Sequence, residues 1–276
     1  MKSNVILRPS SIKSYLSCPR KWFECFINDI PQPQNSRAAI GTASHAGVEM
    51  GWILAMNAGN KEAIDLAAME ATALGKWREI FDDAQGEMSF DKGKDDKDAE
   101  RDVLAATRLL YREVMMLDSV PIPEAVEKRF TVDIDHRVVG SISGSADYVH
   151  GNTIADIKTS KRLIGANAHV LQQTIYKWLA NKNGMDVKHN MIHGVIFVAN
   201  PYVQIFEMDS NEEMMTYVIN GLLAKLDLVY DGADPDVIFH GNTSDYLCSN
   251  LYCGSRNTCP FVHGQPFAGE INGVKL

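Results

Sequence analysis

A short hairpin signal constrains the fold of this chain more than any other feature of its sequence. Residues 141–160 read SISGSADYVHGNTIADIKTS, and the central Gly-Asn dipeptide favours a two-residue turn between two strands. Counting outward from that turn places Asp147 opposite Asp156, and Cβ atoms of such cross-strand neighbours are about 4.5–5.5 Å apart. Lys158 lies two residues beyond Asp156 and so points to the same face of the sheet. The register therefore predicts that two carboxylates and an ammonium converge on one side of a hairpin.

This convergence of charges favours a metal site beside a lysine. Two close carboxylates repel each other unless a proton or a cation lies between them. A hard cation such as Mg²⁺ prefers oxygen ligands, and a neighbouring lysine suits phosphate chemistry. The segment TIADIK is strand-like and largely apolar, so its charges are expected in a mostly buried strand, where they are more often functional. The alternative is a solvated hairpin tip, and a slip of one residue would send the aspartates to opposite faces.

Length and composition allow one large domain with a substantial core. The chain has 276 residues, 45% of them hydrophobic. It has no apolar run of about 18 residues that would predict a membrane span, and its beginning does not resemble a signal peptide, so we expect a cytoplasmic protein. The net charge of −8 argues against broad electrostatic binding of nucleic acid. Much of this acidity falls in residues 81–100, which are expected to form a solvated loop.

Periodic patterns divide the chain into a helical part and a part rich in strands. The expected helices before the strands are 10–26, broken or turned at Pro19, then 42–56, 61–81 and 99–117. Strands are expected at 125–134, 137–150, 152–160, 191–200 and 202–209, with helices at 166–184 and 210–232. This order indicates an α/β core with a helical insertion before the strands.

Several short motifs occur in a fixed order along the chain. They are GTASHAGVE, with Gly-x-x-x-His-x-x-x-Glu spacing, then the strands GSADYV and IADIKTSK, and LQQTIYKWL, with Gln-x-x-x-Tyr spacing. Together they resemble the RecB-type exonuclease branch of the PD-(D/E)XK nuclease superfamily. The strand VEKRF, which contains Glu127, resembles one that often precedes the first aspartate of that branch.

The resemblance covers most of the chain and implies its organisation. It implies a restriction-endonuclease-like core, which is a central mixed β-sheet flanked by helices, with an N-terminal helical insertion and a C-terminal cysteine-rich tail. We expect a single nuclease domain over residues 1–276. Its parts are an N-terminal helix in 1–30, a helical region in 41–120, the catalytic α/β core in 121–230 and the cysteine-rich tail in 231–276.

The resemblance also implies roles for individual residues. The expected ligands of Mg²⁺ or Mn²⁺ are His45, Asp147 and Asp156, joined by the Ile157 carbonyl. Asp147 and Asp156 thereby belong to the catalytic set, together with Lys158, and Gln172 and Tyr176 orient the site or touch DNA.

The helical members of this set have simpler interpretations. His45 and Glu49 share one helix face, and a lone helical histidine is more often an ordinary polar residue, paired here with Glu49. Gln172 and Tyr176 also share a face, and their alternative is a core-edge tyrosine beside a solvated glutamine.

Four of the five cysteines form a pattern of their own. Cys248, Cys253 and Cys259 have C-x4-C-x5-C spacing, and Cys18 precedes Pro-Arg near the beginning of the chain. Free cysteines are usually buried and dispersed, so this clustering disfavours free thiols in a mobile tail. Cys25 lies seven residues after Cys18, and on a continuous helix the two would share a face and could exchange roles.

One early and three late cysteines resemble the iron–sulfur subset of the branch. That subset includes AddB-type helicase–nucleases and the four-cysteine nucleases of CRISPR adaptation. The resemblance implies a structural 4Fe–4S cluster, although the first late gap is two residues longer than the common C-x2-C-x5-C spacing. A Zn²⁺ site would use the same four thiolates.

These patterns predict a metal-dependent DNA exonuclease that hydrolyses phosphodiester bonds in recombination, repair or DNA end processing, of the phage or prophage type. Its expected partners are single-stranded DNA or the end of double-stranded DNA, and a recombination or CRISPR protein; self-association is left open. Candidates for contact with the DNA backbone are Arg20, Lys21, Lys161 and Arg162.

Three alternatives to this prediction stay open. The first is a CRISPR spacer-processing nuclease. The second is a non-catalytic DNA-end-binding iron–sulfur module that keeps the fold. The third is an electron-transfer iron–sulfur protein, which would leave the charges of the hairpin unexplained.

Overall fold

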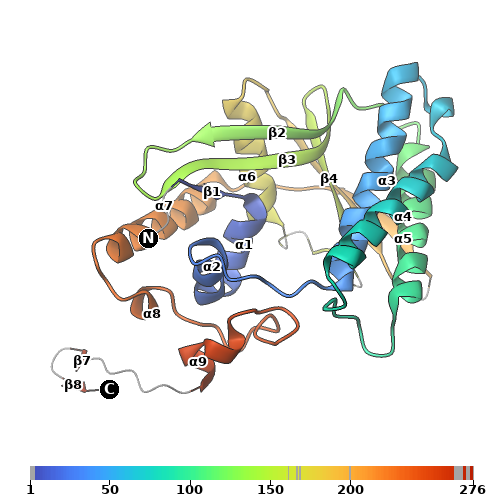
Figure 1. Cartoon of the computed structure of the whole chain (residues 1–276). Helices are drawn as coiled ribbons and strands as arrows, with labels where there is room; N and C mark the ends of the chain where they lie inside the picture. Colours follow the sequence, from blue (N-terminus) through green and yellow to red (C-terminus); the bar gives the residue numbers. More distant parts are fainter. Residues whose placement is uncertain are drawn as a thin grey trace.

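The protein is a mixed β-sheet with helices on both faces (Figure 1). The computed structural model describes residues 4–160, 162–165, 167, 169–198, 200–263, 270–271 and 274–275. Its strands are β1 (Val5–Leu7), β2 (Ala125–Asp133), β3 (Val139–His150), β4 (Thr153–Ser160), β5 (His189–Ile196) and β6 (Tyr202–Glu207), with a separate pair of short strands, β7 (Glu270–Ile271) and β8 (Val274–Lys275).

The helices fall into groups before and after the main strands. Those before β2 are α1 (Pro9–Ser17), α2 (Pro19–Phe26), α3 (Ser36–Ala58), α4 (Leu66–Asp83) and α5 (Asp96–Leu110), with a 3-10 turn η1 (Lys61–Ala63) and a π-helical turn η2 (Tyr111–Met115). The later ones are α6 (Val170–Lys182), α7 (Glu212–Tyr230), α8 (Pro235–Ile238) and α9 (Pro260–His263), with a 3-10 turn η3 (Arg256–Thr258). No helix in the described part of the chain is long and apolar enough to cross a membrane.

The predicted α/β class with a mixed central sheet is confirmed. Strand β3 runs parallel to β1, and β4 runs parallel to β5, whereas the pairs β2–β3, β3–β4 and β5–β6 are antiparallel. Strand β1 was not predicted, because three residues are too few to show a strand period. The segment 1–30, predicted as a helix, therefore contains one strand and two helices. The predicted helical region follows it and lies between β1 and β2 in the sequence.

Strand β3 has an edge that is shared by two partners. Strand β2 pairs with residues 141–149 of β3 along one edge. Some of these same β3 residues also pair with β1 or with β4. A strand has two edges, so β1 and β4 share the other one. On that edge β1 pairs with β3 as far as Ile142, and β4 begins to pair only at Tyr148. The residues between them have no strand partner there, so β3 and β4 diverge and form a fork.

The first helical segment is broken at Cys18. Its backbone is extended there, with φ −154° and ψ 100°, and Pro19 begins α2. Proline is favoured in the first turn of a helix because it has no N–H to donate. No continuous helix connects Cys18 with Cys25, so the interpretation that they share one helix face is wrong.

Helix α3 is longer than predicted. Asn35 caps it by accepting a hydrogen bond from the N–H of Ala38, and Gly59 ends it with φ 70°. Such an Asn cap and Gly stop are typical of helix ends. The added turn at its start brings Gly41 against the side chain of Thr159 in β4.

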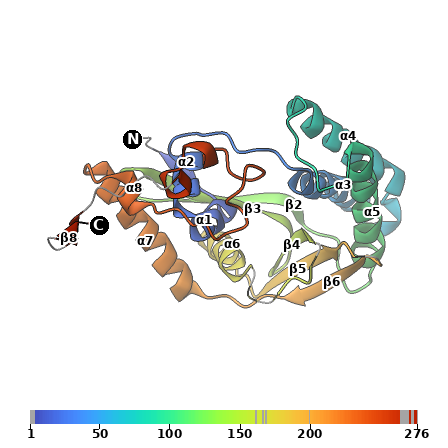
Figure 2. The ribbon, with the colours of Figure 1, turned by 90° about the horizontal axis from the view of Figure 1, so that it is seen from below.

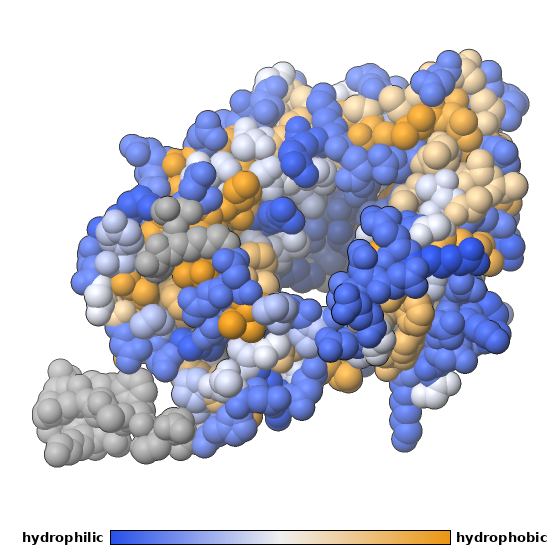
Figure 3. All heavy atoms as spheres, in the orientation of Figure 1, coloured by the Kyte–Doolittle hydropathy of each residue, from blue (hydrophilic) through white to orange (hydrophobic). Residues whose placement is uncertain are grey.

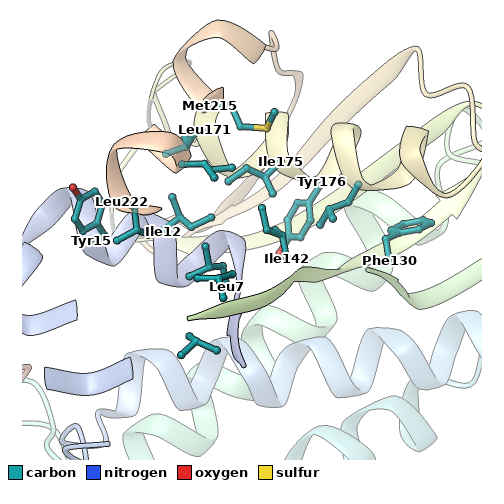
Figure 4. Packing of buried hydrophobic residues seen from close by; sticks show 14 of the residues in the cluster. Leu7, Ile12, Tyr15, Phe130, Ile142, Leu171, Ile175, Tyr176, Met215 and Leu222 are labelled. Carbon is teal, nitrogen blue, oxygen red and sulfur yellow. The ribbon is translucent and has the colours of Figure 1, made fainter. Parts of the chain in front are cut away.

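The two faces of the sheet bury separate cores. On one face α1, α6 and α7 pack residues such as Ile12, Ile175 and Leu222 against Ile142 of β3 (Figures 2 and 4). On the other face α3 and α5 cover β4 and β5, a packing that includes the fully buried Trp52. Burying one large apolar side chain stabilises the fold by about 1.5–3 kcal/mol, so both layers hold the fork in place.

Candidate active site

A cavity of about 510 Å³ lies at the fork between β3 and β4. Figure 3 shows the surface hollowed between the part formed by the sheet with α1 and the part formed by helices α3–α5. The charged or polar side chains that line the cavity include His45, Glu127, Asp147, Asp156, Lys158 and Tyr176. They come from α3, β2, β3, β4 and α6, so elements far apart in the sequence meet at this point.

The hairpin register counted from the sequence is present in the structure. His150 pairs with Thr153 and Tyr148 pairs with Ala155. The next pair would be Asp147 and Asp156, but the ladder ends there and the Asp147 carboxylate accepts a hydrogen bond from the N–H of Ile157 instead. The side chain of Asp147 thus takes the place of a ladder bond where the strands diverge.

Helix α3 brings His45 to Asp147. The His45 Nδ1 lies 3.4 Å from an Asp147 carboxylate oxygen, so the histidine pairs across the cavity and is not an isolated polar residue. Burial lowers the pKa of His45, but the charge and the hydrogen bond of Asp147, with the charge of Asp156, together hold that pKa above its ordinary value. Burial raises the pKa of Asp147, but His45, Lys158 and the N–H of Ile157 together hold that pKa below its ordinary value.

Glu127 completes a group of ligand atoms that sequence reasoning did not assign. One ligand atom each from His45, Glu127 and Asp147 lies within 4.8 Å of the other two. Imidazole nitrogen and carboxylate oxygen are donors that Mg²⁺ and Mn²⁺ accept, so the trio has a suitable donor set for such an ion. From the sequence, Glu127 was noted only as part of a strand that resembles the one preceding the first aspartate, and no role was assigned to it.

The backbone at Glu127 explains why a strand residue reaches the site. Its φ of 46° is in the left-handed region, and the β2–β3 ladder passes from Val126 to Lys128 without pairing it. Left-handed backbone in a non-glycine strand residue is uncommon and is concentrated at functional sites. This irregularity lies beside Asp147 on the neighbouring strand. The alternation of side chains along a strand does not predict this backbone conformation at Glu127.

Asp156 and Lys158 form an ion pair in which the carboxylate is buried and the lysine is half-buried. Lys158 Nζ lies 2.6 Å from Asp156, whose side chain is 4% exposed. Burial raises the pKa of Asp156, and Lys158 opposes that rise. For Lys158, burial lowers the pKa, but the two aspartates outweigh it and keep the lysine cationic. Asp156 is not a member of the His45–Glu127–Asp147 trio. Ile157 lies between Asp156 and Lys158 in β4, and metal binding by its carbonyl stays a prediction.

Gln172 and Tyr176 are linked on one face of α6. Gln172 Nε2 donates a hydrogen bond to Tyr176 Oη over 3.2 Å. Gln172 is only 6% exposed, so the interpretation of a solvated glutamine is wrong. Tyr176 belongs to the core but also lines the cavity. Burial, with the charge of Asp156, raises the pKa of Tyr176 to about 12, so its hydroxyl stays protonated at neutral pH.

The negative charges of the site are crowded. Partial burial, and then the charge of Asp147, raise the pKa of Glu127 to about 7. A carboxyl group whose pKa is raised this far is disfavoured as an anion by its surroundings. A divalent cation between Glu127 and Asp147 would relieve that repulsion.

The four cysteines singled out in the sequence line one cavity of about 20 Å³. Cys18 Sγ accepts hydrogen bonds from the backbone N–H groups of Lys21, at 3.5 Å, and Asn242, at 3.4 Å. Burial raises the pKa of Cys259, and Cys18 and Cys253 contribute to the rise because they are close to it. Cys25 is not among the residues that line this cavity.

Two of the four expected basic contacts to DNA lie at the cysteine cavity. Arg20 forms ion pairs with Glu24 and Asp236 and lines the cysteine cavity, as does Lys21. Arg20 is therefore engaged within the protein, and a role in holding the DNA backbone is not supported. Arg162 is exposed, and Lys161 lies outside the described residues.

Comparison with known proteins identifies the fold and the family. No curated protein matches this chain. A crystal structure of a candidate exonuclease from Eubacterium rectale has the same fold, with a TM-score of 0.51 at 10% sequence identity over 82% of this chain and 80% of that one. The family model of the PD-(D/E)XK nuclease superfamily matches residues 7–260. The chain therefore belongs to the PD-(D/E)XK nuclease superfamily.

Proposed function

We propose that this nuclease is a DNA exonuclease that depends on Mg²⁺ or Mn²⁺. The observation that carries the proposal is the convergence of His45, Glu127 and Asp147 on one point, in the same cavity as the Asp156–Lys158 pair. The donors fit a hard divalent cation, and their crowded negative charge favours one. We propose His45, Glu127, Asp147 and Asp156 as the side chains that hold it, with the Ile157 carbonyl as a further ligand.

The protein groups around that ion suit phosphodiester hydrolysis. When bound, the ion supplies activation of water and stabilisation of phosphate charge. The Lys158 ammonium is oriented by Asp156 and can donate to the attacking water or to a phosphate oxygen, where negative charge increases in the transition state. Water oxygen would form the new bond to phosphorus while the P–O3′ bond breaks. The products are a 5′-phosphate and a 3′-hydroxyl, and the proton lost by water balances the one gained by the leaving oxygen.

The intact set of charges favours a catalytic protein over a non-catalytic DNA-end-binding module. Asp147, Asp156 and Lys158 are all present and all line one cavity. A binding module has no need to keep a half-buried lysine beside a buried aspartate, since such a pair is at best weakly stabilising. We propose a role in recombination, repair or end processing, with CRISPR spacer processing as the alternative.

Degradation of end-labelled DNA tests the proposed function. We expect single- or double-stranded substrates to be shortened from an end when Mg²⁺ or Mn²⁺ is present, and to stay intact in EDTA. A circular substrate of the same sequence is the matched control and is expected to resist. Cleavage that continues in EDTA would refute the metal dependence, and equal cleavage of circles would refute the exonuclease assignment.

We propose further that the four cysteines hold a structural 4Fe–4S cluster. The four cysteines line one cavity, and four thiolates are the usual complement of such a cluster. Two backbone N–H groups donate to the sulfur of Cys18. A zinc site would use the same four thiolates, so the metal content separates the two assignments.

The visible absorption spectrum of anaerobically purified protein tests the cluster. We expect a brown protein with a broad band that Cys18→Ser removes and Cys25→Ser leaves intact. Cys18→Ser should also lower Tm by several degrees, because the cluster joins Cys18 to Cys248 and closes a long loop. A colourless wild-type protein that contains zinc would contradict the iron–sulfur assignment.

A further inference from the structure

A second cavity, of about 430 Å³, lies beside α1 and the beginning of α6. Its polar lining consists of Lys13, Ser17, Asn167, His169, Gln172 and Asn211, and none of the residues that line it is an aspartate or a glutamate. The chain as a whole carries a net charge of −8. A cavity with one lysine and no carboxylate is therefore a local exception that favours an anion.

Lys13 and His169 contact each other in this cavity. Lys13 Nζ lies 3.4 Å from His169 Nδ1. Gln172 Oε1 lies at the same distance of 3.4 Å from that nitrogen, so Lys13 and Gln172 share one ring atom of His169. Burial, and then the charge of Lys13, lower the pKa of His169 to about 4, so the ring is neutral at pH 7. Lys13 therefore offers an ammonium group to a ligand beside a neutral ring.

The first turn of α6 adds donors to the same place. Helix α6 begins at Val170, and the preceding His169 makes no side-chain cap hydrogen bond. The first amide N–H groups of a helix have no partner within the helix. They carry partial positive charge and bind phosphate groups in many proteins.

This cavity adjoins the active-site cavity. Gln172 lines the second cavity and bonds to Tyr176, which lines the first. The two residues are about one helical turn apart, roughly 5.4 Å along the axis. Helix α1 spans both places as well, since Pro9 lines the active-site cavity and Lys13 the second. Burial lowers the pKa of Lys13, the charge of Lys158 lowers it further, and the charge of Asp156 opposes both.

We propose that Lys13, His169 and the first turn of α6 bind a DNA backbone phosphate next to the phosphate that is cleaved. The inference rests on the proposed nuclease function and adds a substrate-binding subsite to it. A negatively charged phosphate here would relieve the repulsion between Lys13 and Lys158. Its contacts carry no sequence information, so they would set the register of the strand in the site.

Substitution of Lys13 by methionine tests the subsite in steady-state cleavage of an oligonucleotide. We expect KM to rise about tenfold with kcat nearly unchanged, because one charge-assisted contact to the substrate is lost. The dependence of the logarithm of affinity on the logarithm of salt concentration should fall by about 0.7–0.9. Lys13→Arg is expected to restore most of the affinity. The exposed Lys182, at the end of α6, provides the control variant Lys182→Met.

A single neutral methylphosphonate moved along the oligonucleotide locates the contact. Wild-type protein should lose affinity when the neutral group occupies one position adjacent to the scissile bond. The Lys13→Met protein should show no further loss at that position. A Lys13→Met protein with the KM and salt dependence of Lys182→Met would overturn the subsite while wild-type cleavage still supports the nuclease. Absence of cleavage by the wild-type protein would instead refute the function on which the subsite rests.

Discussion

Replacement of Lys158 by methionine is expected to lower kcat for DNA cleavage by a factor of about 10²–10³. Methionine keeps most of the side-chain length but removes the ammonium group that lies 2.6 Å from Asp156 and faces the active-site cavity. The donor that opposes charge on the phosphate oxygens is then missing, whereas the metal ligands stay in place. Single-turnover cleavage at saturating Mn²⁺ measures the effect on the chemical step.

The variant also changes stability, so folding is measured beside activity. Removing one partner of a buried ion pair can lower the free energy of unfolding by about 3–5 kcal/mol, because the other charge stays buried. Thermal melting identifies a temperature at which the variant is folded, and cleavage is measured below it. Lys182→Met is the matched control and should cleave like wild type. Wild-type rates from folded Lys158→Met protein would contradict the role of this lysine.

Replacement of Asp147 by asparagine is expected to abolish both cleavage and stabilisation by metal. The asparagine side-chain oxygen can still accept the N–H of Ile157, so the fork between β3 and β4 is preserved. One negative charge is lost, and the His45–Glu127–Asp147 trio loses a ligand. Wild-type protein at a Mn²⁺ concentration about 100 times Kd should gain about 2.7 kcal/mol of stability, and we expect the variant to lose most of that gain.

Thermal melting with and without Mn²⁺ measures this second effect. Asp133→Asn changes the same residue type at an exposed position at the end of β2, and this control should keep the full rise in Tm with Mn²⁺. The metal-free Asp147→Asn protein lacks the charge that repels Glu127 and raises its pKa. We expect removal of this repulsion to limit the loss of folding stability in the absence of metal. An undiminished rise in Tm for Asp147→Asn would show that the ion binds elsewhere.

The local patterns of the sequence were sufficient for the hairpin and for most of the sheet. A Gly-Asn turn fixes which residues of β3 and β4 face each other, and the structure has that register at His150 and Thr153. Helical periodicity likewise located α3, which carries His45, and α6, which carries Gln172 and Tyr176. These signals are local, because each depends on residues that are neighbours in the sequence.

Features that depend on contacts between distant segments could not be predicted in the same way. Strand β1 is stabilised by parallel pairing with β3, about 130 residues later in the chain. Glu127 reaches the site through a left-handed backbone conformation that alternation along a strand does not encode. Arg20 resembled a DNA contact in sequence, but the fold brings the distant Asp236 to it as an ion-pair partner. Tertiary structure decided each of these cases.

Anomalous diffraction from wild-type crystals soaked in MnCl₂ tests the metal site at the fork most directly. We expect a manganese peak within bonding distance of a His45 nitrogen and of carboxylate oxygens of Glu127 and Asp147, with Lys158 still paired to Asp156. Crystals in which these side chains point apart, with no manganese among them, would contradict the proposed metal-dependent chemistry of this nuclease.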